Sequence, residues 1–320
     1  MKIKKALKIT GKILIGLLIL LVVFLMALFI YHRIMLNKED ELLKSYPGQL
    51  VEVSGHNMNV YAEGEGSHTL VFLAPAGDTS PALTFKPLYS KLNSEYKTVV
   101  IEKFGYGMSD IIDTDRDYLT MVNECREALA KADVEDPYIL CPFSKSGIDA
   151  LIWAQEYPDE IEAIISIDMA FPEACSEIEM PENNSDGLIS VLKEMGFVRF
   201  FVNDGMYPDI YSSEEKAMLS ALICRKYGNR VYANEILSLP EACNMINSRP
   251  KPDIPMHLFL TNASGTGMDK EAWHDFSKNY IRDIKNVMVT EFDCSHGSLV
   301  NKESEQMYED FKKFIENLNA

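Results

Sequence analysis

The sequence predicts an α/β fold, a mostly parallel sheet flanked by helices, preceded by a membrane-spanning helix. From about residue 69 onward, short apolar runs rich in Val, Ile and Leu alternate with longer stretches of helical periodicity. This alternation is typical of strand–helix–strand units, in which parallel strands are covered by helices on both faces. About 280 residues follow the N-terminal apolar run, which is a common size for a single α/β domain.

Residues 13–30 form an uninterrupted apolar run that is long enough to cross the hydrocarbon core of a bilayer. Five lysines precede the run, and no small-residue cleavage site follows it. We therefore expect residues 1–35 to be a single-pass signal-anchor in the cell membrane. The lysine-rich N-terminus should lie in the cytoplasm and the rest of the chain outside it. A late-cleaved or lipid-associated form is the alternative.

Six later segments are predicted to be buried strands. In chain order they are residues 69–73, a strand that starts at residue 98, and residues 138–141, 161–168, 255–261 and 286–292. Apolar runs indicate the third and the sixth, and the family resemblance given below implies the other four. After the fourth of these strands, roughly 80 residues with helical patterns and many aromatic side chains interrupt the alternation. We expect residues 171–252 to form a helical cap inserted into a core made of residues 36–170 and 253–320.

The sequence predicts two features of the cap. Ser212 and Glu215 have the spacing of a capping box for a helix that runs toward Gly228. The aromatic side chains are expected mostly to pack the cap against the core, with an acyl pocket as the alternative. They are Phe197, Phe200, Phe201, Tyr207 and Tyr211.

Ser144 is the candidate nucleophile, because it stands between a predicted strand and a predicted helix. A nucleophile at such a strained turn leaves room only for small side chains two residues before and after it. Pro142 and Ser146 hold these positions, where the usual G-x-S-x-G pattern has glycine. A helix that starts after the serine would also direct its free N–H groups toward a developing oxyanion. The alternative is that Ser144 only caps that helix.

His296 is the candidate general base. It follows the last predicted strand, in the loop DCSHG of residues 293–297, and precedes the C-terminal helix. None of the other five histidines occupies such a strand-to-helix loop. Histidine can deprotonate a serine hydroxyl near neutral pH, since its pKa lies close to 7. The alternative is a solvated surface histidine.

With these motifs in this order, the chain resembles the α/β-hydrolase family from about residue 51 to the C-terminus. The segment GYGMSD of residues 105–110 and the loop APAG of residues 74–77 match the family's turn and oxyanion loop after successive strands. The elbow is similar to the P-H-S-x-S-G variant of some bacterial members, although Phe143 replaces the histidine. The resemblance implies an eight-stranded, mostly parallel sheet and hydrolysis by a Ser–acid–His triad without a cofactor.

The acid of the triad is expected to be Asp168, at the end of the fourth predicted strand. Most of the family carries the acid after the next strand, where this chain has Gly265 and no carboxylate before Asp269. Some members instead carry it where Asp168 stands, so Asp269 is the alternative. Ser144, Asp168 and His296 keep the chain order of the family.

The oxyanion hole is expected to use the backbone N–H groups of Lys145 and Ala76. Pro75 cannot contribute, because proline has no N–H. The side chain of Lys145 is expected to point into solvent, with a preference for acidic substrates as the alternative.

Charge and cysteine content limit the partners. The net charge is −17, and residues 1–35 hold six basic residues and no acid, which leaves −23 on the rest. Such a surface disfavours nucleic acid and anionic lipid, so membrane association should rest on residues 13–30. The six cysteines are scattered without C-x-x-C spacing, so no metal site is expected. A bridge between Cys175 and Cys243 is left open.

The leading hypothesis is a membrane-anchored, extracytoplasmic serine hydrolase that acts on a small-molecule acyl substrate, of the esterase or lipase type. Epoxide hydrolases and dehalogenases of this fold need a carboxylate at the elbow, where this chain has a hydroxyl. A peptidase of the proline iminopeptidase kind would need a carboxylate cluster in the cap, for which Glu173, Glu177 and Glu179 are available. A catalytically silent ligand-binding or sensor domain is the third hypothesis.

Overall fold

The computed structural model describes residues 2–177 and 191–318, which contain a mostly parallel sheet of eight strands. The strands are Gln49–Val53 (β1), His56–Glu63 (β2), Thr69–Leu73 (β3), Lys97–Glu102 (β4), Tyr138–Pro142 (β5), Ile161–Ile167 (β6), Met256–Leu260 (β7) and Val287–Glu291 (β8). Their order in the sheet is β1-β2-β4-β3-β5-β6-β7-β8. The predicted fold class is therefore confirmed. All six predicted strands are present, and the five that were predicted with both bounds agree to within one residue at either end.

Strand direction determines where the loops meet. The β1–β2 and β2–β4 pairs are antiparallel, whereas the pairs from β4 to β8 are parallel. The carboxyl ends of parallel strands lie at one edge of the sheet, so the loops after β3, β5, β6, β7 and β8 converge there.

Helices cover both faces of the sheet. They are α2 (Pro81–Thr84), α3 (Lys86–Leu92), α4 (Tyr118–Lys131), α5 (Gly147–Glu156), α11 (Lys270–Ile281) and α12 (Leu299–Leu318). Side chains on β3 alternate between the two cores, as the period of a strand requires. Val71 and Leu73 pack in the cluster that contains α4, α5 and α11, whereas Leu70 and Phe72 pack with α3 and α12.

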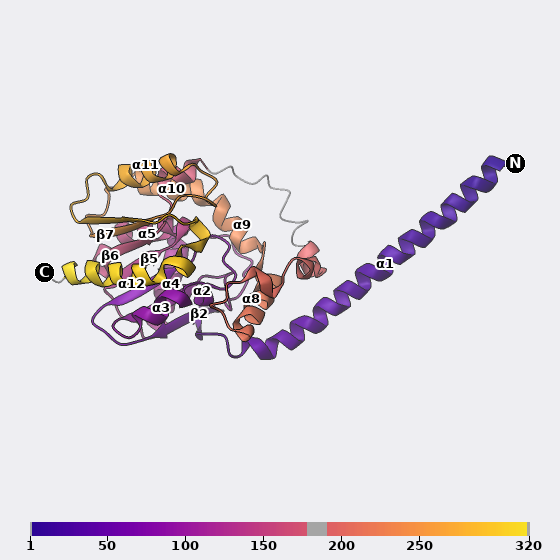
Figure 1. Cartoon of the computed structure of the whole chain (residues 1–320), viewed down its shortest axis with the longest axis horizontal. Helices are drawn as coiled ribbons and strands as arrows, with labels where there is room; N and C mark the ends of the chain where they lie inside the picture. Colours follow the sequence, from indigo (N-terminus) through magenta and orange to yellow (C-terminus); the bar gives the residue numbers. More distant parts are fainter. Residues whose placement is uncertain (1, 178–190, 319–320) are drawn as a thin grey trace.

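Between β6 and β7 the chain leaves the sheet, and we term the described residues 168–177 and 191–255 the insertion. Its elements are α6 (Pro172–Ser176), η3 (Phe197–Phe200), η4 (Asp204–Met206), α8 (Ser213–Lys226), α9 (Arg230–Leu237) and α10 (Leu239–Asn247). The predicted capping box is confirmed, since Ser212 and Glu215 each bond the other's backbone N–H at the start of α8. In Figure 1, α8 and α9 lie on the side of the sheet that faces the N-terminal helix.

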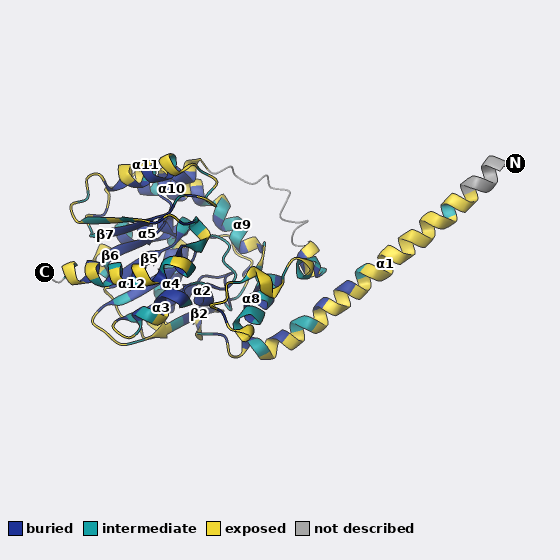
Figure 2. Ribbon diagram, in the orientation of Figure 1, coloured by how far each residue is buried: buried dark blue, intermediate teal, exposed yellow. Residues whose placement is uncertain are grey.

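The N-terminal helix α1 (Lys2–Leu43) projects far from the sheet (Figure 1) and is the one described helix long and apolar enough to span a membrane. It continues well beyond residue 30, where the apolar run ends. Most of its surface is exposed, but a buried stripe begins at Leu28 and continues through His32, Glu39 and Leu43 (Figure 2). These residues are four or seven positions apart, one or two helical turns, and so mark one helix face. Arg199 and Arg225 of the insertion contact this side of α1.

Glu102, at the end of β4, connects α1 to the sheet. Its buried carboxylate accepts hydrogen bonds from the Tyr46 hydroxyl, the Asn59 amide and the backbone N–H groups of Ala82 and Met108. Tyr46 lies three residues after the end of α1. The Glu102 carboxylate therefore connects the C-terminal end of this helix to β2, α2 and the loop after β4.

Candidate active site

Ser144 lies at the turn between β5 and α5, as the strand–turn–helix pattern predicts. Its φ angle of 57° falls in the left-handed region, a strained conformation that is common at functional turns. Ser146 stands where the usual pattern has glycine. Its hydroxyl donates to the Leu73 carbonyl at 2.8 Å and accepts from the Phe143 N–H at 2.9 Å. Serine fits this buried position because its polar group is fully bonded there.

His296 and Asp168 are brought together by the ends of β8 and β6. Nδ1 of His296 lies 2.6 Å from Oδ2 of Asp168. The imidazole ring is flanked by Phe143 and Trp273, with ring centroids 5.0 Å and 5.8 Å away. His296 and Ser144 line the same cavity, although no hydrogen bond joins their side chains within the described residues.

Asp168 is fully buried, and three further hydrogen bonds hold its carboxylate. Oδ1 accepts from the Thr261 N–H at 3.1 Å and from Trp273 Nε1 at 2.8 Å, and Oδ2 accepts from the Thr261 hydroxyl at 2.6 Å. Burial alone would raise the pKa of this carboxyl, but His296 and the donors from Thr261 and Trp273 outweigh burial and lower the pKa. The carboxylate is therefore charged at neutral pH and keeps the proton of His296 on Nδ1.

The alternative acid, Asp269, has a different role. It is the N-cap of α11 and accepts from the Ala272 N–H at 2.9 Å. Gly265 does lie beside the histidine, since a Cβ added there would be 3.8 Å from His296 Cβ. The loop after β7 thus approaches His296 with a glycine, and the carboxylate at the histidine comes from the end of β6.

The cavity in front of Ser144, termed the serine cavity, has a volume of about 560 Å³ and is lined by loops after the parallel strands. Ala76 and Lys145, the two predicted oxyanion donors, both line it. Within the described residues, no hydrogen bond engages either backbone N–H. Both donors remain available to an oxygen bound at the serine.

The prediction that the Lys145 side chain points into solvent is wrong. Lys145 is only 3% exposed, and its Nζ lies 2.6 Å from Glu235 Oε1 and 3.0 Å from the Tyr118 hydroxyl. Glu235 belongs to α9 and also binds Lys103 and the Tyr106 hydroxyl. The partner of Lys145 lies 90 residues further along the chain, so the local sequence gave no signal of this contact.

These groups form what we term the buried ion cluster, which joins the insertion to the core. Its members are Lys103, Tyr106, Tyr118, Lys145, Asp149 and Glu235. Its two lysines balance its two carboxylates. Burial alone would raise the pKa of Glu235, but Lys103 and Lys145 outweigh burial and hold that pKa well below its usual range.

Asp78 is a functional candidate that the sequence did not reveal. It lies in the loop after β3, lines the serine cavity, and accepts from the Ser80 N–H at 2.9 Å through Oδ1. Its Oδ2 is buried without a hydrogen-bond partner within the described residues. Burial raises the pKa of this carboxyl to about 6. Thr261 and Trp273, which orient Asp168, were also missed, because their contacts are made only in the folded chain.

Other predicted sites can be located as well. Glu173 and Glu177 are exposed and do not line the serine cavity, and Glu179 lies outside the described residues. All six cysteines are free and buried, so no disulfide joins Cys175 to Cys243. Within the described residues, no group of three or more His, Cys, Asp or Glu side chains is arranged to hold a metal ion.

This arrangement of sheet, elbow and loops is the α/β-hydrolase fold, and solved structures with that fold match the chain. An esterase from Thermogutta terrifontis aligns with a TM-score of 0.61 at 17% identity, over 85% of this chain and 100% of its own. A bacterial membrane phospholipase A aligns with a TM-score of 0.58 at 18% identity, over 97% of this chain and 99% of its own. At such identities the likeness concerns the fold.

Sequence relatives identify the family more closely. The uncharacterized protein YbdG of Bacillus subtilis is 39% identical over 220 residues, which are 66% of this chain and 67% of YbdG. The chain belongs to the same family as YbdG. The 2-(acetamidomethylene)succinate hydrolase of Mesorhizobium japonicum is 26% identical over 166 residues, 50% of this chain and 56% of that enzyme. No family model matches the chain.

Proposed function

We propose that this chain is a membrane-anchored serine hydrolase that cleaves an ester-like acyl substrate. Ser144 is the nucleophile, His296 the general base, Asp168 the orienting acid, and the N–H groups of Lys145 and Ala76 the oxyanion hole. The observation that carries the proposal is the 2.6 Å contact between Asp168 and His296 at the edge of a cavity that also holds the strained Ser144. The hydrolase names of similar proteins support it further.

The chemistry follows acyl transfer in two steps. Nε2 of His296 takes the proton of Ser144 as Oγ attacks the acyl carbon, and the carboxylate of Asp168 stabilises the imidazolium that forms. The N–H groups of Lys145 and Ala76 bind the oxyanion. In comparable sites, each such donor stabilises the transition state by about 3–4 kcal/mol. The imidazolium then gives its proton to the departing alcohol, and water releases the acid from Ser144 by the same path.

Covalent labelling with a fluorophosphonate probe tests this proposal on the full-length chain. We expect one adduct, mapped by mass spectrometry to Ser144, that Ser144→Ala and His296→Ala abolish. Ser94→Ala and His56→Ala change exposed residues of the same types and should label like the parent. An adduct at another serine would refute the assignment.

The membrane topology is part of the proposal, with the N-terminus in the cytoplasm and the body outside. The lysines before residues 13–30 support this orientation. All six native cysteines are buried, so single cysteines can be introduced against a low background. We expect a membrane-impermeant maleimide to label Lys44→Cys in intact cells and Lys8→Cys only after lysis. The reverse pattern would show the opposite orientation.

A catalytically silent ligand-binding domain is the second candidate. The observation that favours it is the lack of a hydrogen bond between Ser144 and His296 within the described residues. Such contacts often form only when substrate is bound, which is why the hydrolase remains our first proposal. A folded, monodisperse sample that no fluorophosphonate labels would support the silent domain instead.

A further inference from the structure

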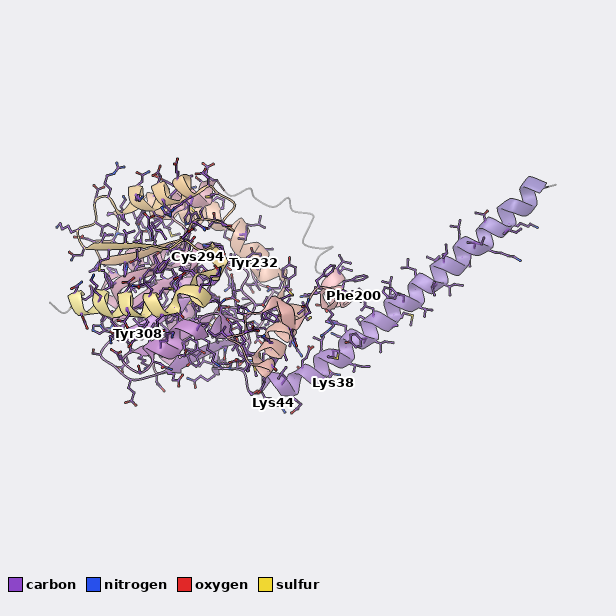
Figure 3. The ribbon with its side chains drawn as sticks, in the orientation of Figure 1. Lys38, Lys44, Phe200, Tyr232, Cys294 and Tyr308 are labelled. Atoms are coloured by element: carbon purple, nitrogen blue, oxygen red, sulfur yellow. The ribbon has the colours of Figure 1, made fainter. Side chains whose placement is uncertain are left out.

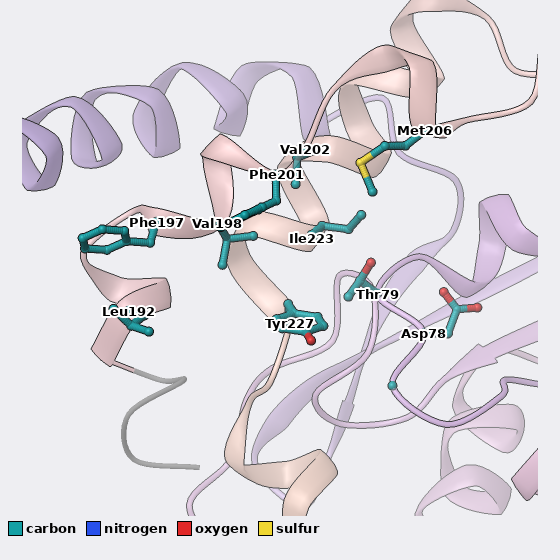
Figure 4. A pocket seen from close by; sticks show the side chains of 11 residues that line it. Asp78, Thr79, Leu192, Phe197, Val198, Phe201, Val202, Met206, Ile223 and Tyr227 are labelled. Atoms are coloured by element: carbon teal, nitrogen blue, oxygen red, sulfur yellow. The ribbon is translucent and has the colours of Figure 1, made fainter. Parts of the chain in front are cut away.

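A second cavity, termed the apolar pocket, adjoins the serine cavity. It has a volume of about 630 Å³, and Figure 4 shows the side chains that line it, which come mainly from η3, the segment after it and α8. They include Val198, Phe201 and Ile223. Gly77 and Asp78, in the loop after β3, line both cavities. The two spaces therefore meet beside the predicted oxyanion donor Ala76.

Contacts with α1 fix the height of this pocket relative to the membrane span. Nε of Arg199, in η3, donates to Nδ1 of His32 at 2.9 Å. A Cβ added at Gly196 would lie 2.7 Å from His32 Cβ, so the backbone there packs directly on the helix. His32 is only two residues beyond the apolar run, about 3 Å along the helix axis. The polar layer of a bilayer extends roughly 5–8 Å from its hydrocarbon core, so η3 lies at the level of that layer.

The buried face of α1 also reaches into the apolar run of residues 13–30. Leu28, inside the run, is only 7% exposed, so the buried face of α1 begins within the apolar run. Arg199 also pairs with Glu39 at 2.6 Å, and Arg225 with Asp40 at 2.9 Å. These pairs hold the insertion against α1, and with it the pocket.

The surface beside the pocket is apolar and open. Phe200 and Phe201 are 60% and 75% exposed, and Figure 3 shows Phe200 on the part of the insertion that faces α1. Clustered exposed aromatic side chains are unusual on a soluble surface and common where a protein enters a membrane interface. The expectation that these aromatic residues mainly pack the cap on the core holds for Tyr211, which is buried against Leu83, but not for these two.

We propose that the apolar pocket receives the acyl chain of a bilayer lipid, directly from the membrane in which α1 is anchored. This inference rests on the proposed function and names its substrate class, a long-chain lipid ester. Phe200 and Phe201 insert into the lipid interface. The acyl chain of the lipid enters between η3 and α8, and the ester group of the lipid lies at Ser144. The body carries −23 charges outside residues 1–35, which disfavours an anionic headgroup.

Hydrolysis by the full-length chain in vesicles of palmitoyl-oleoyl phosphatidylcholine tests the substrate class, with p-nitrophenyl butyrate as a soluble short ester. We expect Ile223→Trp, which fills the pocket, and the exposed double change Phe200→Asp/Phe201→Asp each to lower fatty-acid release about tenfold or more. Both should keep the rate on the short ester within about twofold. Ile111→Asp alters an exposed apolar loop residue outside both cavities and should change neither rate. Equal losses on both substrates would overturn the inference.

A binding experiment separates this inference from catalysis. Ser144→Ala is placed in vesicles that contain phosphatidylcholine with a photoactivatable diazirine near the end of one acyl chain. We expect a light-dependent adduct on the α8 peptide that contains Ile223, lost when Val198→Trp fills the pocket. Adducts confined to residues 13–30 would overturn the lipid site.

The two experiments distinguish the two proposals. Hydrolysis of the short ester without pocket adducts or a chain-length effect would keep the serine hydrolase and refute the lipid site. Pocket adducts without hydrolysis of either ester would refute the hydrolase and leave a lipid-binding site. A lack of both hydrolysis and adducts would refute both.

Discussion

The orientation of His296 depends on one carboxylate and on the groups that hold it. Asp168 lies in left-handed backbone at the end of β6, and Thr261 and Trp273 donate to both of its oxygens. The Oδ2 atom of Asp168 also faces Nδ1 of His296. A carboxylate fixed on three sides can accept the Nδ1 proton in only one geometry, which leaves Nε2 as the basic nitrogen for Ser144.

The two candidate acids can be compared directly by matched substitutions. Asp168→Asn should lower the rate of fluorophosphonate labelling about 10³-fold or more, because a neutral amide cannot stabilise the imidazolium. Asp269→Asn should leave the rate within about twofold, since asparagine also caps helices. Labelling kinetics on the two purified variants provide the measurement. A greater loss from Asp269→Asn would exchange the two assignments.

Asp78 should make stability depend on pH. Its folded pKa of about 6 lies above the unfolded value near 3.9, so the folded state binds more protons between these limits. The carboxyl therefore contributes its full stability below about pH 4, and that contribution is lost as the pH rises through 6. Asp78→Asn should raise the free energy of unfolding by about 3 kcal/mol at pH 7.5 and by only about 1 kcal/mol at pH 4.5.

Thermal unfolding of the detergent-solubilised chain at both pH values checks this prediction. Asp209→Asn is the control, because its carboxylate is fully exposed and pairs with Lys216 on the surface. A gain for Asp78→Asn that is the same at both pH values would show that a cause other than titration is responsible.

At the level of elements, the buried ion cluster fastens α9 to the edge of the sheet where the parallel strands end. Glu235 accepts from Lys103 after β4, from Tyr106 in the next turn and from Lys145 beside Ser144. The backbone N–H of Lys145 is the proposed oxyanion donor. Its side chain and its N–H are thus constrained together, and the insertion supports the geometry of the elbow.

Glu235→Gln should destabilise the protein by about 3–5 kcal/mol, because two buried lysines would then face Asp149 alone. It should also slow labelling of Ser144 under conditions where the variant remains folded. Glu241→Gln, on the exposed face of α10, should change neither quantity. Denaturant unfolding followed by labelling measures both effects. A stable Glu235→Gln variant would mean that the cluster is not maintained by charge balance.

The sequence predicted elements and loops better than it predicted contacts across them. All six predicted strands are present, because apolar runs bounded by polar loops determine strands locally. Ser144, His296 and Asp168 could be proposed because each follows a strand of a parallel sheet. The burial of Lys145 and the role of Thr261 could not be predicted, since both depend on partners about 90 residues away in the chain.

The length of α1 likewise depends on contacts that the local sequence does not reveal. The apolar run predicted a span that ends near residue 30, yet the helix continues to Leu43. The added turns contain three Leu and two Glu, which favour helices, but contacts with Arg199 and Arg225 of the insertion hold them. Hydropathy identifies the part of a helix that lipid can surround and does not identify the part that a protein surface stabilises.

At the scale of the whole molecule, α1 is the proposed membrane anchor and also the surface on which the insertion packs. Basic residues gather at its N-terminal end, whereas the body carries a strong negative charge. Electrostatic attraction to anionic lipid therefore cannot hold the body at the membrane. In the proposed arrangement, apolar contact of α1 with lipid and the packing of the insertion on residues 32–40 of α1 position the serine cavity.

The docking contact makes a prediction for the whole molecule. Glu39 is buried and binds Arg199 through two hydrogen bonds of 2.6 Å and 3.0 Å. Glu39→Ala leaves the Arg199 guanidinium without a carboxylate partner, so the insertion should open more often. Amide hydrogen exchange in residues 197–206 should then rise about 10- to 100-fold. Glu41→Ala is the matched control on the same helix, because Glu41 is exposed and pairs only with Lys44 at the surface. Hydrogen-exchange mass spectrometry on both variants gives the comparison. If the two variants exchange alike, the ion pair does not secure the insertion, and apolar contact along α1 alone must do so.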